Sequence, residues 1–149
     1  MTSKTSPRCC PVDTPLMEVL EGSGWRLAVD RNRTPFPVLV GGDGWASELS
    51  TAEAQALARA ASTLQEEHRA LMDRLMPEEA ITLEREGPVG DPPQGGELWL
   101  ELEGDRRCWS LRFVLSPGAG HRALEGSWRA ESAAAFVAAL TSHPEISPS

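Results

Sequence analysis

Residues 36–64 read FPVLVGGDGWASELSTAEAQALARAASTL and contain one complete structural module. An apolar strand comes first, a glycine-rich turn and a short strand led by Trp45 follow, and an alanine-rich helix ends the module. Residues 113–140, FVLSPGAGHRALEGSWRAESAAAFVAAL, repeat this order. Each helix needs a sheet face on which to bury its apolar side. The repeat therefore predicts a pseudo-symmetric α+β domain, because one chain supplies both halves.

The segments on either side of the first module extend the same pattern. Residues 24–30 alternate apolar and polar side chains, which is typical of a strand with one buried face. Turn-forming residues at 30–35 separate this strand from the apolar run of the module. Ser50, with Glu53 three positions later, forms a capping box, so we expect a helix from there to Met76.

Residues 97–112 favour a β-hairpin with a two-residue turn at Gly104 and Asp105. This turn places apolar side chains on one face and charged pairs on the other. Each cross-strand pair of this kind contributes up to about 1 kcal/mol. The predicted apolar face holds Leu98, Leu100, Trp109 and Leu111, and the predicted charged pairs are Glu97 with Arg112 and Glu103 with Arg106.

The complete pattern predicts two antiparallel sheet-plus-helix repeats in the order β-β-β-α-β-β-β-β-α. We place one α+β domain over residues 21–143, with the internal repeats at about 25–76 and 81–141. Residues 1–20 are expected to form a disordered N-terminal tail, and residues 144–149 a C-terminal tail. The ordered pattern begins near Met17, and our hypothesis is that Met17 is an alternative translation start or the true one.

The composition excludes several classes of protein. The 149 residues carry a formal net charge of −8. Such acidity disfavours long-range attraction to nucleic acid or to an anionic membrane. No window approaches the roughly 18 consecutive apolar residues of a membrane span, and the first residues lack the apolar stretch of a secretory signal. Three cysteines without a pairing motif fit a reducing, cytoplasmic setting.

The chain offers few groups for catalysis. Of its three histidines, His68 lies on the apolar face of a helix and is expected to pack, and His143 at a helix end is expected to be solvated. His121, in a loop, is the candidate for a functional role, and an enzyme built around it is our third interpretation. Cys9 and Cys10 are adjacent in the tail and could bind a soft metal, although a dispensable tail is the simpler interpretation. We therefore predict no catalytic residue, no cofactor, no metal site and no enzymatic activity.

The chain has five tryptophans and no tyrosine. Trp25, Trp45, Trp109 and Trp128 fall on the same strand faces as leucine and valine, so we expect most of them in the core. In particular, Trp45 and Trp128 precede the two helices in equivalent places, and both rings are expected to be buried there. Trp99 points to the opposite face, among glutamates. An exposed tryptophan of this kind is a partner contact or a base-stacking contact, or a second element covers it.

The candidate binding surface combines this tryptophan with arginines that the two halves do not share. Arginines in turns can cluster after folding although they are separated in sequence. The predicted surface consists of Trp99, Arg106, Arg107, Arg112 and Arg122.

Four separated motifs carry a resemblance to a known family: EGSGWRL at 21–27, FPVLVGGDGW at 36–45, LWLELEGD at 98–105 and LEGSW at 124–128. Together they resemble the cyanobacterial domain-of-unknown-function family 1818. The resemblance implies the Whirly or PUR-alpha type of fold, in which two sheet-plus-helix repeats pack together. Proteins of that fold include single-stranded DNA-binding transcription regulators. The resemblance implies no catalytic residue, because the family has no established reaction.

Two functional hypotheses follow. The first is a non-enzymatic binding or accessory protein that contacts another protein in a cyanobacterial cytoplasmic complex. The alternative is a single-stranded nucleic-acid-binding, transcription-related protein, whose affinity would fall steeply with added salt. In both cases we expect no membrane contact and a monomer, because one chain already contains both halves of the repeat.

Overall fold

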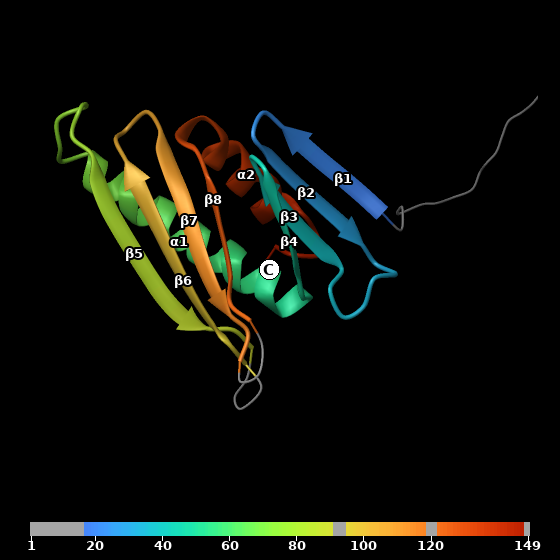
Figure 1. The fold of residues 1–149 in the computed structure, drawn as a ribbon. Helices are drawn as coiled ribbons and strands as arrows, with labels where there is room; N and C mark the ends of the chain where they lie inside the picture. Colours follow the sequence, from blue (N-terminus) through green and yellow to red (C-terminus); the bar gives the residue numbers. More distant parts are fainter. Residues whose placement is uncertain (1–16, 91–94, 119–121, 148–149) are drawn as a thin grey trace, which may run out of the picture.

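The computed structural model describes residues 17–90, 95–118 and 122–147 (Figure 1). It has two four-stranded antiparallel sheets and two helices, so the predicted α+β class is confirmed. The predicted elements occur in the predicted order, and one further strand precedes them. The first sheet consists of β1 (Met17–Gly22), β2 (Trp25–Asp30), β3 (Val38–Gly42) and β4 (Trp45–Leu49), and α1 (Thr51–Met72) follows it in the chain. The second set is β5 (Ile81–Pro88), β6 (Glu97–Gly104), β7 (Trp109–Ser116), β8 (Leu124–Trp128) and α2 (Ala130–Ser142).

The two sheets lie side by side, and the helices cover one side of both (Figure 1). β8 contacts β3 and β4, so these strands form the seam between the halves. Each helix also crosses to the other half: α1 packs mainly on β5 and β6, and α2 packs on both β7 and β2. Neither half could therefore bury its helix alone, and the two repeats share one core.

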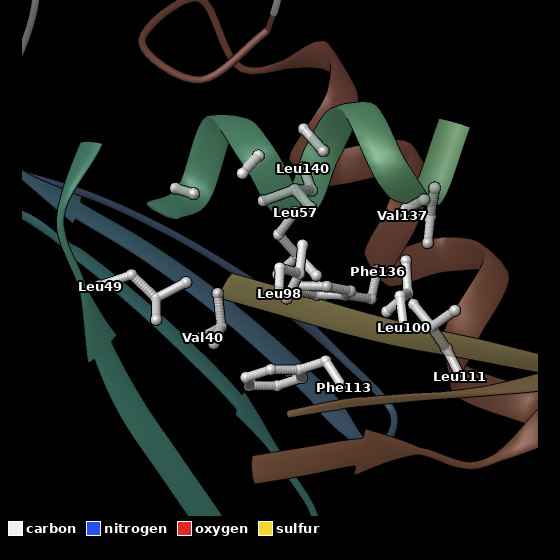
Figure 2. Packing of buried hydrophobic residues seen from close by; sticks show 14 of the residues in the cluster. Val40, Leu49, Leu57, Leu98, Leu100, Leu111, Phe113, Phe136, Val137 and Leu140 are labelled. Atoms are coloured by element: carbon white, nitrogen blue, oxygen red, sulfur yellow. The ribbon is translucent and has the colours of Figure 1, made fainter. Parts of the chain in front are cut away.

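The core gathers between the helices and the inner faces of the sheets. Figure 2 shows Leu57 of α1, Leu140 and Phe136 of α2 and Phe113 of β7 on the side of the sheet strands that faces the helices, and all four are buried. The ring of Phe136 stacks on that of Trp128 with centroids 3.9 Å apart and planes 14° apart. These aromatic rings come from α2, β7 and β8, so they join the closing helix to the second sheet.

The capping box predicts the start of α1 correctly. The Ser50 hydroxyl accepts a hydrogen bond from the Glu53 backbone N–H at 3.1 Å, and the Glu53 carboxylate accepts one from the Ser50 N–H at 2.8 Å. The helix ends at Met72 rather than at Met76. Beyond it the chain tightens into turns, in which the Leu75 N–H donates to the carbonyl three residues earlier. No helix in the described ranges is long and apolar enough to cross a membrane.

Strand β1 includes residues 17–20, which were expected to belong to the N-terminal tail. It pairs antiparallel with β2, from Met17 opposite Asp30 to Gly22 opposite Trp25. Five of its six residues are exposed, so the strand has no regular apolar side that could signal it in the sequence. Its position at the edge of the sheet explains this exposure.

His143 is buried, so the prediction of a solvated side chain is wrong. Its Nδ1 accepts a hydrogen bond from the Glu145 backbone N–H at 3.1 Å, and therefore Nε2 carries the proton and donates to Glu18 of β1, also at 3.1 Å. The contact ties the end of α2 to the edge strand. The following residues also belong to the fold rather than to a tail, because Ile146 is fully buried.

The β6–β7 hairpin has the predicted faces but a different register. Leu98, Leu100, Trp109 and Leu111 are all buried. The loop, however, contains residues 105–108, and Gly104 pairs with Trp109. The predicted charged pairs are therefore wrong: Arg112 stands opposite Glu101, Glu103 stands opposite Ser110, Glu97 stands opposite Ser116, and Arg106 lies in the loop. The predicted faces are correct because the observed register differs from the predicted one by an even number of residues, which leaves each side chain on the same side of the sheet.

The tryptophans divide into two groups. Trp128 and Trp109 are 1% and 7% exposed, as predicted for core residues. Trp25 and Trp45 are half-buried and pack against the core. The Trp45 ring lies at the seam over Gly126, where it donates from Nε1 to the Ser127 carbonyl at 3.0 Å. The prediction of full burial therefore holds for Trp128 and fails for Trp45.

Candidate interaction surface

The outer side of the second sheet carries Trp99 and Arg112, two of the five residues of the predicted binding surface. Along β6, Leu98, Leu100 and Leu102 are buried against the helices, so the residues between them point outward. The strand register places outward-pointing residues of β5, β7 and β8 beside them. We call this surface the glutamate face, and its main residues are Glu84, Glu86, Glu97, Trp99, Glu101, Glu103, Arg112, Val114 and Glu125.

Trp99 lies at the centre of the glutamate face and is half-buried. Its indole Nε1 donates to a carboxylate oxygen of Glu84 at 3.2 Å. The guanidinium carbon of Arg112 lies 4.8 Å from the centre of the ring, which is cation–π distance. Val114 is its cross-strand neighbour. The ring is thus held in place by its own sheet, with one face against a guanidinium group.

The charge of this surface is strongly negative. Six of its residues are glutamates and one is an arginine, which gives a formal charge of −5. Arg112 lies 3.7 Å from a Glu101 oxygen and 3.5 Å from a Glu125 oxygen. These distances are long and the groups are partly solvated, so the pairs neutralise the face only locally.

The predicted arginines do not converge on Trp99. Only Arg112 lies beside it. Arg106 and Arg107 lie in the β6–β7 loop at one end of the sheet, and the Arg106 guanidinium donates to the Met72 and Leu75 carbonyls at the end of α1. Arg122 is exposed before β8, at the other end of β7. These four arginines therefore form no continuous basic groove.

Glu84, Glu86 and Glu125 belong to the glutamate face but not to the predicted binding surface. Glu84 and Glu86 are two positions apart in one strand, so the sequence pattern alone could have placed both side chains on the same side of the sheet. Their proximity to Trp99 depends on the pairing of β5 with β6, and that of Glu125 on the pairing of β8 with β7. A single sequence does not specify which strands pair.

Asp105 organises the loop that carries Arg106 and Arg107. Its carboxylate accepts hydrogen bonds from the Cys108 N–H at 3.1 Å and from the Arg107 N–H at 2.9 Å. These two backbone donors favour the charged form and lower the pKa of Asp105 from its ordinary value. The turn is thus built for an ionised side chain, which explains why the loop is longer than two residues.

We expect Asp105→Asn to alter the response of the protein to acid. Because the folded pKa lies below the unfolded one, ionised Asp105 stabilises the folded state above the unfolded pKa, which is about 3.9. This stabilisation disappears as the pH falls through the lowered folded pKa. We expect the melting temperatures of the wild-type protein and Asp105→Asn, measured between pH 2 and pH 7, to differ by a constant amount near neutrality. This difference should shrink at the acid end. A difference of equal size at both ends would contradict this role.

The histidines and cysteines form no candidate site in the described chain. His68 is buried, and its Nε2 lies 3.1 Å from the Gly104 carbonyl oxygen, which confirms its packing role. His121, Cys9 and Cys10 lie outside the described residues. Within residues 17–90, 95–118 and 122–147, no three His, Cys, Asp or Glu side chains lie together as possible metal ligands.

The comparisons with known proteins agree with the motifs in the sequence. The model of a family described as a domain of unknown function, DUF1818, matches residues 20–143. The chain belongs to this family. A similar solved structure is that of a protein of unknown function from Prochlorococcus sp. NATL2A, assigned to the DUF155 family, with 32% sequence identity and a TM-score of 0.70. The match covers 85% of this chain and 97% of that one. No curated protein matches the chain.

Proposed function

We propose that this member of the DUF1818 family is a non-enzymatic binding protein whose glutamate face docks a basic segment of a partner protein. The observation that supports this proposal is the formal charge of −5 around a fixed tryptophan ring. Complementary charge steers association and selects against partners of the same sign. Tryptophan and arginine are also the side chains that most often supply binding energy at protein interfaces.

The geometry around Trp99 indicates what the partner would present. The guanidinium group of Arg112 already lies over the Trp99 ring, with its carbon 4.8 Å from the ring centre. Glu84, Glu86 and Glu101 surround the ring with carboxylates from two paired strands. Arginine forms paired hydrogen bonds with a carboxylate and stacks on aromatic rings, whereas lysine does only part of this. We therefore propose an arginine-containing segment as the occupant.

The cellular setting and the finer fold type belong to the same proposal. We place the protein in a cyanobacterial cytoplasmic complex, with support from its similarity to the Prochlorococcus protein. We also assign the fold to the Whirly or PUR-alpha type, with support from two sheets that are each followed by a helix. Single-stranded nucleic acid is the alternative partner, but its phosphates would face six carboxylates on the glutamate face.

A binding titration tests the proposal with two defined probes. We expect a fluorescein-labelled nona-arginine peptide to bind at low salt, and a labelled oligothymidine of similar size to show no binding. The double variant Glu84→Gln/Glu101→Gln should weaken peptide binding by about tenfold, since each lost contact is worth roughly 0.7 kcal/mol. Fluorescence anisotropy at several salt concentrations measures both affinities.

The matched control removes two carboxylates elsewhere. Glu78 and Glu79 are exposed between α1 and β5, and Glu78→Gln/Glu79→Gln gives the same change in net charge. If this variant weakens peptide binding as much as the first does, the attraction is due to net charge and the glutamate face is not the site. Binding of the oligothymidine in preference to the peptide would instead support the nucleic-acid alternative.

A further inference from the structure

A second candidate site lies on the opposite side of the same sheet, where α1 crosses the edge strand β5. We propose that the cavity between these two elements binds a small organic anion, whose carboxylate or phosphate group is held by Arg59 and Arg85. The cavity has a volume of about 310 Å³, within the range of small-molecule sites. Figure 1 shows α1 running behind the second sheet, with β5 at its outer edge.

The cavity exists because the residues that face each other across it are small. Ala56 and Ala60 line it from α1, and Gly87 lines it from β5. Gly87 pairs with Leu98, so it lies on the side of the sheet that faces the helices. A Cβ atom built on Gly87 would meet no heavy atom within 4 Å. At most other positions of this sheet the inner side is filled by leucine, isoleucine or an aromatic ring.

Two guanidinium groups reach this cavity from different elements. Arg59 projects from α1 and Arg85 from β5, and both line the cavity. Arg85 has one carboxylate near it, Glu67, whose oxygen lies 4.0 Å away. Arg59 forms no ion pair with any residue in the described ranges. Both groups can therefore bind an added oxyanion without first losing a strong internal partner.

The remaining lining residues limit what the ligand can be. Leu98 supplies an apolar wall together with Ala56 and Ala60, and the hydroxyl of Thr63 adds a hydrogen-bonding group. Glu86 and Pro88 also line the cavity, but in the strand register they pair with Trp99 and Glu97 and so belong to the opposite face. A ligand with one anionic group and a small apolar body would match these surfaces, because arginine forks bind carboxylate and phosphate by paired hydrogen bonds.

Isothermal titration with phenyl phosphate, benzoate and inorganic phosphate at matched ionic strength tests the site. We expect binding of phenyl phosphate or benzoate to be tighter than that of inorganic phosphate, because only the organic anions use the apolar wall. Arg59→Met and Arg85→Met should each weaken binding by about tenfold or more. Arg74→Met is the matched control, because Arg74 is exposed beyond the end of α1 and does not line the cavity.

Gly87→Val provides a second, steric test that keeps both arginines. The new side chain would enter open space, so the folded protein should keep its thermal stability while it loses ligand binding. Absence of binding to the wild-type protein by all three anions would overturn the proposal. The proposal would also be overturned if Gly87→Val bound the anions as tightly as the wild-type protein does. The same holds if Arg59→Met and Arg74→Met lost equal amounts of anion affinity.

Discussion

Trp128→Ala is expected to lower the free energy of unfolding by about 3–5 kcal/mol. The side chain is 1% exposed, and its ring stacks on Phe136 at 3.9 Å and on Phe113 at 5.6 Å between centroids. Its Nε1 also donates to the Gly41 carbonyl at 2.9 Å, across the seam between the sheets. A small domain has about 5–15 kcal/mol of total stability, so this one change would remove a large part of it.

Urea unfolding followed by circular dichroism measures this loss, with two controls. Trp99→Ala removes the same type of side chain from the half-buried glutamate face, and we expect a loss of about 1 kcal/mol. Trp128→Phe keeps an aromatic ring but leaves the Gly41 carbonyl without its donor, so an intermediate loss of about 1–3 kcal/mol is expected. Equal losses for the alanine variants of Trp99 and Trp128 would contradict the central position of Trp128 in the core.

The sequence predicts most of the regular elements because their signals are local. The capping box at Ser50 requires only four consecutive residues, and it defines the start of α1. The faces of β6 and β7 follow from alternation within each strand. Register is different, because it depends on the geometry of the turn. The hydrogen bonds of the Asp105 carboxylate extend the loop, and this changes every cross-strand pair but leaves each side chain on its predicted face.

Features that depend on distant contacts could not be predicted in the same way. Strand β1 is recognisable only from its pairing with β2 and from the contact between Glu18 and His143, which lie 125 positions apart. The position of Arg106 at the end of α1 is also a tertiary contact. The sequence therefore identifies Trp99 and the glutamates of its own strand as a surface, but not which arginine covers the ring.

Gly126→Val is expected to destabilise the protein by about 1–3 kcal/mol, although valine favours strands. A Cβ atom at Gly126 would lie 2.3, 2.6 and 2.7 Å from three ring atoms of Trp45. The ring has little freedom to move, because it contacts Trp128 at 5.1 Å and Phe113 at 5.9 Å between centroids and donates a hydrogen bond to Ser127. The steric conflict therefore outweighs the gain in strand propensity.

Two comparisons separate this conflict from a general effect of glycine replacement. Gly87→Val makes the same change in a strand where no atom lies within 4 Å of the new Cβ, so no such loss is expected there. In a double-mutant cycle with Gly126→Val, Trp45→Ala removes the ring that the new valine side chain would strike. We expect the two effects to be non-additive by about 0.5–3 kcal/mol, with the double variant more stable than the sum predicts. Additive losses of stability would mean that Gly126→Val destabilises only its own strand. Coupled losses would show that the ring of Trp45, in the first repeat, needs a glycine at position 126 in the second.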